Sequence, residues 1–145
     1  MLVADGEGAV GMEFTSTTVR RQGMDGRGRL CHANRLLEDH GGVHDDPTYL
    51  PDSRFRVDRM RQLVGRKFDS QGESGVMVSL TEFGTLFEDE ENFPAAICRV
   101  QDGESNSATL FNIVMDLRQK RAIVRLGRPC RPEETYVLDF EDAIA

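Results

Sequence analysis

The residues best suited to chemistry lie close together, between positions 31 and 46. They offer a thiol, imidazoles, an amide and carboxylates, from Cys31, His32, Asn34, His40, His44, Asp45 and Asp46. Thiolate, imidazole and carboxylate groups are zinc ligands, a thiol beside an imidazole can act as a nucleophile, and an amide can stabilise an oxyanion. The segment therefore suggests a metal site, a thiol catalyst or an oxyanion donor.

The metal and thiol interpretations of this segment have little support from the spacing of its residues. The cysteines and histidines have no compact ligand spacing such as C-x-x-C, and loop histidines are commonly solvated. Leu30 to Arg35 resembles a strand, in which the neighbouring side chains of Cys31 and His32 point to opposite faces. A packed Cys31 is favoured, and a zinc or thiol protein built on Cys31, His40 and His44 is the weaker alternative.

A glycine pattern near the start of the chain suggests a nucleotide site but fits one poorly. Gly6 to Gly11 matches G-x-G-x-x-G, yet the phosphate-binding form needs a helix to begin there. The next residues, Met12 to Arg21, are typical of a strand. We expect a hairpin turn.

The elements that would position these residues begin with strands. Leu2–Ala4 and Ala9–Phe14 predict a hairpin, and Arg29–Ala33 predicts a third strand of an antiparallel meander, after the β-branched residues Thr17–Val19. Residues 36–51 are rich in turn formers and predict a surface loop.

Two helices are predicted in the middle of the chain. The first begins at Asp52 or Ser53 and runs to Val64, with Gly65 as its stop. Its arginines, among them Arg56 and Arg59, predict a solvated or ion-paired face. The second begins at the capping box Ser79–Glu82.

Strands return in the last third of the chain. Thr109–Asp116 predicts a central strand covered on both faces, followed by strands at Ala122–Leu126 and Thr135–Phe140. The order of elements indicates an α+β layered fold in a single domain, residues 1–145.

Composition limits the partners and the compartment. The net charge of −7 argues against nucleic acid, and no apolar stretch is long enough for a membrane span. Three widely spaced cysteines suit reduced thiols, which favours a cytoplasmic location.

Four blocks of the sequence occur in an order that is informative. The first joins Ala4–Gly8 to Gly11–Glu13, and the second is His32–Arg35. The third is Asn92–Arg99, and the fourth runs from Thr109–Leu117 to Gly127–Cys130. In this order the blocks resemble the acyl-coenzyme A:isopenicillin N acyltransferase family of self-cleaving cysteine N-terminal-nucleophile (Ntn) hydrolases, in which the second block is similar to the family's His-Thr-Asn-His segment.

The resemblance implies a four-layer αββα fold, of which this chain would form the C-terminal portion. It implies Asn34 as the oxyanion-hole donor and Arg99 as a substrate-binding or supporting residue. It also implies acyl transfer from a thioester to an amine, or amide hydrolysis. No cofactor is expected, and acyl-coenzyme A is a possible substrate. The expected partners are a small-molecule acyl donor, an amine and the segment or subunit that carries the nucleophilic cysteine.

Departures from the family pattern leave alternatives open. Ala33 and Arg35 replace the usual Thr and His, and Met1 is followed by Leu2 rather than by a cysteine. We therefore expect the nucleophile from an upstream segment and little activity from this chain alone. A catalytically silent interaction module is the alternative, with Asn34 satisfying backbone groups at a strand end and Arg99 in a surface ion pair.

Overall fold

The computed structural model describes residues 1–45, 51–69, 78–103 and 106–140. The chain divides into two compact units, Met1–Val57 and Asp58–Ala145, and each is described by itself. The prediction of a single domain stays a prediction.

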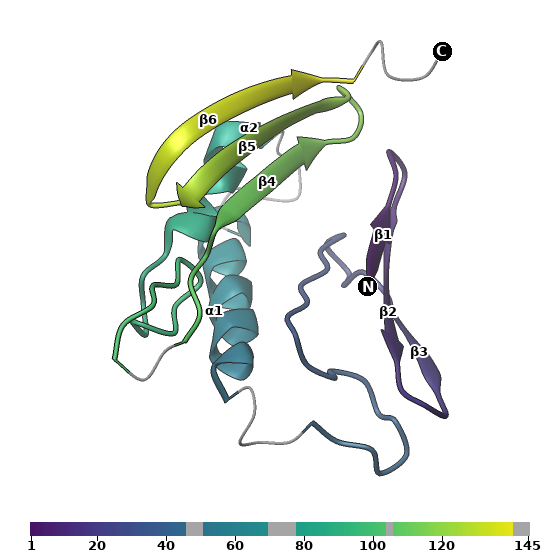
Figure 1. Ribbon diagram of the computed structural model, residues 1–145. Coiled ribbons are helices and arrows are strands. Elements are labelled where there is room, and N and C mark those ends of the chain that lie inside the picture. Colours follow the sequence, from purple (N-terminus) through teal and green to yellow (C-terminus); the bar gives the residue numbers. More distant parts are fainter. Residues whose placement is uncertain (46–50, 70–77, 104–105, 141–145) are drawn as a thin grey trace. The chain divides into compact units, whose positions relative to one another are not determined.

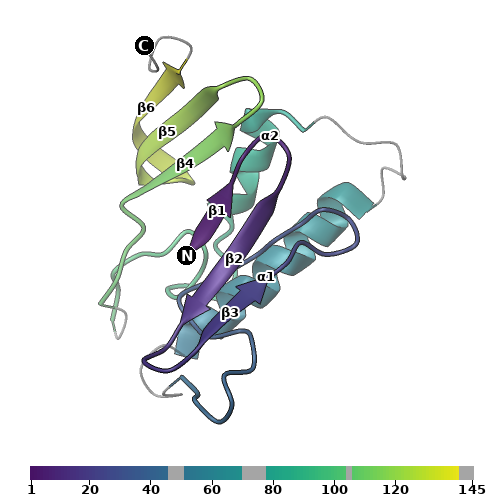
Figure 2. The same ribbon diagram turned by 90° about the vertical axis from the view of Figure 1, so that its right-hand side faces the viewer.

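The first unit contains a three-stranded antiparallel sheet (Figure 2). Strands β1 (Leu2–Ala4), β2 (Ala9–Phe14) and β3 (Val19–Gln22) are hydrogen-bonded in the order β1-β2-β3. In the turn after β1, Asp5 Oδ1 accepts the N–H groups of Glu7 (2.8 Å) and Gly8 (2.9 Å). The predicted hairpin is confirmed, and no helix begins at the glycine pattern.

The third strand of this sheet differs from the prediction. It is Val19–Gln22, whereas Arg29–Ala33 forms no strand. Asp25 Oδ1 accepts the N–H groups of Arg27 (2.9 Å) and Arg29 (3.0 Å), so the chain turns before Leu30. The Cys31 carbonyl then accepts a hydrogen bond from the Gln22 side chain, at 3.3 Å, instead of joining a ladder.

Helix α1 (Pro51–Phe68) spans the boundary between the units and runs past its predicted stop at Gly65. A glycine inside a helix costs only about 1 kcal/mol, and basic residues in the last turn favour continuation. One of them, Lys67, donates from Nζ to the Glu82 carbonyl (2.8 Å) and to Thr85 Oγ1 (2.7 Å). These bonds attach the last turn to the next helix.

Helix α2 (Leu80–Gly84) begins at the predicted capping box. Ser79 Oγ accepts the Glu82 N–H, and a Glu82 carboxylate oxygen accepts the Ser79 N–H, both at 3.2 Å. The chain continues as a 3₁₀ turn, η2 (Thr85–Glu88), in which Leu86 is buried.

The second sheet is formed by β4 (Phe111–Asp116), β5 (Arg121–Arg128) and β6 (Arg131–Asp139), in that order and antiparallel. Within the described ranges β4 is an edge strand, so its prediction as a central strand was wrong. Helix α2 contacts β4 and β5 on one face (Figure 1), where Asn112 and Val114 are buried. The coarse α+β prediction is confirmed.

No helix among the described residues has both the length and the apolar character needed to cross a lipid bilayer.

Candidate functional site

A single buried carboxylate organises the segment that carries Asn34. Glu13 lies on β2 and is only 3% exposed. Its Oε1 is 2.9 Å from His32 Nε2 and accepts the Leu37 N–H at 2.7 Å. Its Oε2 is 3.0 Å from His40 Nε2 and accepts the Glu38 N–H at 3.0 Å. We call Glu13, His32, His40 and the two N–H groups the Glu13 cluster.

The electrostatics of Glu13 follow from these four contacts. Burial alone would favour the neutral acid, but hydrogen bonds from Glu38, Leu37, His40 and His32 outweigh it, and the pKa of Glu13 lies below its ordinary value of 4.5. Glu13 is therefore an ionised acceptor near neutral pH, and each histidine contributes an Nε2 hydrogen to it.

Both ring nitrogens of His40 are occupied by protein groups. Nε2 contacts Glu13, and Nδ1 is 2.6 Å from Thr18 Oγ1, which is itself 2.7 Å from Thr15 Oγ1. Across the described ranges, Cys31, His40 and His44 do not bring their ligand atoms within reach of one ion. The weaker zinc hypothesis is wrong for these three residues, and Asp46 lies outside the described residues.

Asn34 lies at the apex of a tight turn between groups bound by Glu13. The Arg35 N–H donates to the Ala33 carbonyl at 2.8 Å, and since the φ of Asn34 is not positive, this is an inverse γ-turn. The next N–H, from Leu36, donates to Asp45 Oδ2 at 2.7 Å. The Asn34 side chain is exposed. Because no strand ends here, a role in satisfying strand-end backbone groups does not apply.

Arg99 is positioned by Thr109 in the second unit. The Arg99 N–H donates to Thr109 Oγ1 (3.0 Å), and the Thr109 N–H donates back to the Arg99 carbonyl (3.2 Å). Thr109 Oγ1 also donates to the Ile97 carbonyl at 3.1 Å. The arginine side chain is half-buried. Two of the four blocks therefore meet at this pair.

The nearby acids are paired with other arginines. Asp89 binds Arg59, the expected ion-paired arginine of α1, through three contacts of 2.6 to 3.1 Å. Glu88 accepts from Arg125 Nη1 at 2.6 Å, and Glu90 accepts from Arg128. Asn34 and Arg99 themselves belong to different units.

The organising role of Glu13 was missed from the sequence, although a signal was present. Gly11 and Glu13 alternate along β2 as its two buried residues. A carboxylate at such an inward position needs hydrogen-bond partners, so it predicts a polar cluster beneath the strand. Which groups would supply those partners depends on the path of a loop more than 20 residues further along.

Comparisons with known proteins agree with the four blocks. The sequence profile of the family described as acyl-coenzyme A:6-aminopenicillanic acid acyl-transferase matches residues 1–131. The chain belongs to this family. It is 39% identical over 143 residues to a protein of Emericella nidulans named acyl-coenzyme A:6-aminopenicillanic-acid-acyltransferase 40 kDa form. That alignment includes 98% of this chain and 38% of the relative, so the chain spans little more than a third of the relative's length.

Proposed function

We propose that this chain forms part of an enzyme that transfers an acyl group from a thioester to an amine, or hydrolyses an amide. The carrying observation is the exposed Asn34 side chain at the apex of a turn that the Glu13 cluster restrains on both sides. The hydrogen bonds at His32 and Leu37 hold the backbone on both sides of Asn34, and an amide side chain carried by such a turn can donate to an oxyanion without losing its proton. Family membership supplies the reaction class.

In the proposed reaction a cysteine thiolate attacks the acyl carbonyl, after its proton has passed to a base, its own α-amine. The carbonyl oxygen becomes an oxyanion, which accepts a hydrogen bond from the Asn34 amide. The intermediate then breaks the C–S bond of a thioester or the C–N bond of an amide, and the α-ammonium gives its proton to the leaving group, which departs as coenzyme A or as a neutral amine. An amine or water attacks the acyl-enzyme, its proton passes to the α-amine, and cleavage of the acyl–sulfur bond releases the product and restores the cysteine. Arg99 would bind a substrate carboxylate through its guanidinium group.

We further propose that the nucleophilic cysteine comes from a segment or subunit outside this sequence and is exposed there by self-cleavage. The cysteines of the second unit are poor candidates: Cys98 is fully buried, and burial with the neighbouring Cys98 raises the pKa of Cys130 to about 11. Cys31 is half-buried and lacks the free α-amine that an N-terminal nucleophile uses.

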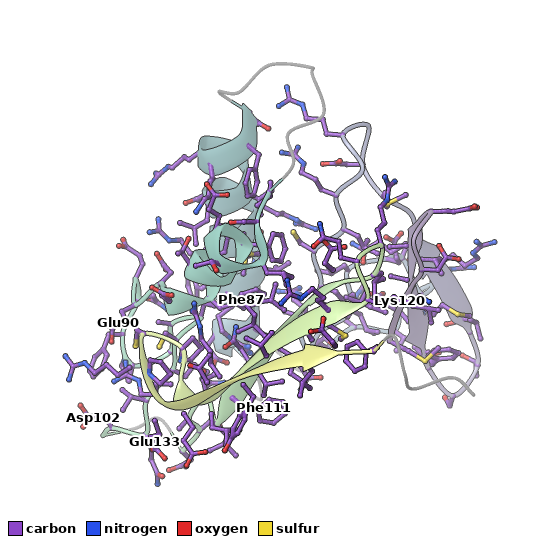
Figure 3. All side chains as sticks on the ribbon, turned by 90° about the horizontal axis from the view of Figure 1, so that it is seen from above. Phe87, Glu90, Asp102, Phe111, Lys120 and Glu133 are labelled. Atoms are coloured by element: carbon purple, nitrogen blue, oxygen red, sulfur yellow. The ribbon has the colours of Figure 1, made fainter. Side chains whose placement is uncertain are left out.

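The open face of the second sheet supports an αββα sandwich. Opposite the α2 side, Phe111, Ile113 and Met115 of β4 are 43–56% exposed, and Tyr136 and Leu138 of β6 extend this apolar surface. Figure 3 labels Phe111 at the start of β4. A second sheet packed on this face would bury these side chains, as in other layered folds.

The test of the oxyanion assignment uses the full-length gene product that contains this chain. Asn34→Ala should lower turnover by on the order of 10²-fold or more, measured as coenzyme A release and as amide formation. Asn34→Asp should be similarly impaired, since an ionised carboxylate keeps the shape but cannot donate. Asn106→Ala, at another exposed asparagine, is the matched control. Near-normal turnover of both Asn34 variants would refute the assignment.

A catalytically silent interaction module is the second candidate, and the same open apolar face favours it. A module would bind a partner through that face and show no acyl transfer. Full-length protein that releases no coenzyme A, shows no self-cleavage and binds a partner only when Phe111 and Met115 are unsubstituted would support this candidate.

A further inference from the structure

Three side chains of types that can bind a metal ion, from separate parts of the second unit, converge. Glu90 follows η2, Cys98 lies in the loop leading toward β4, and Cys130 lies in the turn between β5 and β6. One ligand atom from each lies within 4.8 Å of the other two. Among the described residues this is the one group of three or more such side chains with this spacing.

The backbone around the two thiols is fixed by hydrogen bonds. The Cys98 N–H donates to the Asp89 carbonyl at 2.9 Å, which places Cys98 beside the acidic segment. The Cys130 N–H points at Cys98 Sγ, at 3.4 Å. Cys98 is fully buried, Cys130 is half-buried and Glu90 is exposed, so the group has a protected side and a side open to solvent.

Arg128 connects the carboxylate with the thiol loop. Its Nη2 donates to Glu90 Oε1 and, at 3.4 Å, to the Cys98 carbonyl. An arginine in this place would restrain Glu90 by one oxygen and leave the other available to a cation. Hydrogen bonds of this kind to the groups that bind a metal are a regular feature of protein metal sites.

We propose that Glu90, Cys98 and Cys130 bind one Zn²⁺ ion, with water or an external ligand in the fourth position. Two sulfurs and one carboxylate oxygen suit zinc, whereas Mg²⁺ and Ca²⁺ prefer oxygen alone. Zinc–sulfur bonds of about 2.3 Å in a tetrahedron place the sulfurs roughly 3.8 Å apart. Because the ligand atoms already lie within 4.8 Å of one another, the two sulfurs would need to approach by no more than about 1 Å.

Binding would form two zinc–thiolate bonds and one zinc–carboxylate bond, and would release the two thiol protons to solvent without any oxidation or reduction. The ion would cross-link the loop at Glu90–Cys98 to the β5–β6 turn. This site involves neither Asn34 nor Arg99, so a test of zinc binding is independent of a test of acyl transfer.

Cobalt is the direct probe, because Co²⁺ substitutes for Zn²⁺ and its thiolate charge-transfer and tetrahedral d–d bands are visible. Titration of the reduced full-length protein should saturate at one Co²⁺ per chain at this site, and added Zn²⁺ should remove the bands. Cys98→Ser and Cys130→Ser should each greatly reduce the charge-transfer band. Glu90→Gln should weaken binding by about tenfold or more with the fold unchanged. Cys31→Ser is the matched control and should leave the titration unaltered.

Two results would overturn the proposal. The first is the absence of a thiolate charge-transfer band from reduced wild-type protein that is folded by circular dichroism, or the persistence of that band in the double variant Cys98→Ser/Cys130→Ser. The second is a Cys98–Cys130 disulfide, seen by mass spectrometry, as the resting form of protein purified without reductant and containing no zinc.

Discussion

Residues 1–45 and the second unit bury different kinds of side chain. In residues 1–45 the buried side chains are Glu13 and His40, both polar, and they contact one another. In the second unit the buried side chains are mainly apolar, among them Val64, Leu86 and Val114. The first region is therefore organised by directional hydrogen bonds around one charge, and the second by packing between α2 and a sheet.

This difference has consequences for how each region responds to change. Apolar packing is roughly proportional to buried area and depends little on pH. A buried carboxylate with four partners is effective only while it is ionised and every partner is present, because an unsatisfied buried group is costly. The structure of the loop that carries Asn34 should thus depend more strongly than that of the sheet on pH and on the loss of any one hydrogen-bond partner.

The largest expected effect comes from removing the central carboxylate. Glu13→Ala leaves two histidines and two N–H groups without their acceptor, so we expect a loss of about 3 kcal/mol. Hydrogen exchange at the Leu37 and Glu38 amides should report it directly. Glu7→Ala, at an exposed glutamate in the preceding turn, should change stability by less than about 0.5 kcal/mol. Unchanged protection in Glu13→Ala would remove the basis of the comparison.

In the second unit, Val114→Ala should cost about 2 kcal/mol, from lost transfer free energy and the cavity left behind. Denaturation followed by circular dichroism measures it, and the loss should not vary with pH. Val137→Ala is the matched control: Val137 lies on β6 of the same sheet and is 56% exposed, so its replacement should cost less than about 0.5 kcal/mol. Equal losses for both valines would mean that packing does not stabilise this sheet.

Acid should destabilise the Glu13 cluster more than the apolar packing of the second unit. The folded-state pKa of Glu13 is below its ordinary value of 4.5. Its contribution to the free energy of unfolding is therefore complete at pH values above 4.5 and is lost as the pH falls through the folded-state pKa. Glu13→Gln should cost about 1.5 kcal/mol near neutral pH and should abolish this part of the acid sensitivity. The measurement is protection of the Leu37 amide from neutral pH to about pH 3. An acid sensitivity that persists unchanged in the glutamine variant would assign it to other groups.

The smallest expected effect concerns the ion pair of α1. Arg59 binds both oxygens of Asp89, which raises the pKa of the guanidinium, and Arg59→Lys should cost about 1 kcal/mol since lysine cannot form the paired contact. Arg61→Lys is the control, because Arg61 is 3.6 Å from Asp58 with both side chains about half exposed. The loss of stability should be larger for Arg59→Lys than for Arg61→Lys, and high salt should reduce this difference only slightly if the Arg59 pair is protected from solvent.

Features that depend on neighbouring residues could be predicted from the sequence. The capping box at Ser79 and the hairpin after β1 each need only three or four consecutive residues. The error at Gly65 has the same local origin: a glycine is only a weak barrier, and the contacts of Lys67 with Glu82 and Thr85 lie 15 and 18 residues away.

The path of the chain through Arg29–Ala33 could not be predicted in this way. Its residues have strand-like composition, but Leu37 and Glu38 donate to a carboxylate 24 and 25 residues earlier. The approach of Cys130 to Cys98 likewise joins positions 32 residues apart. The four blocks correctly identified the family, and the functional roles of Asn34 and Arg99 remain predictions.

The bond between Glu13 and Leu37 closes a loop of 24 residues without a covalent link. The entropy of closing a flexible loop grows only logarithmically with its length, so doubling the loop costs about 0.6 kcal/mol. The exposed turn at Gly26, far from both ends of this closure, is therefore a place where the chain can gain residues while the closure, and the turn at Asn34, keep their geometry.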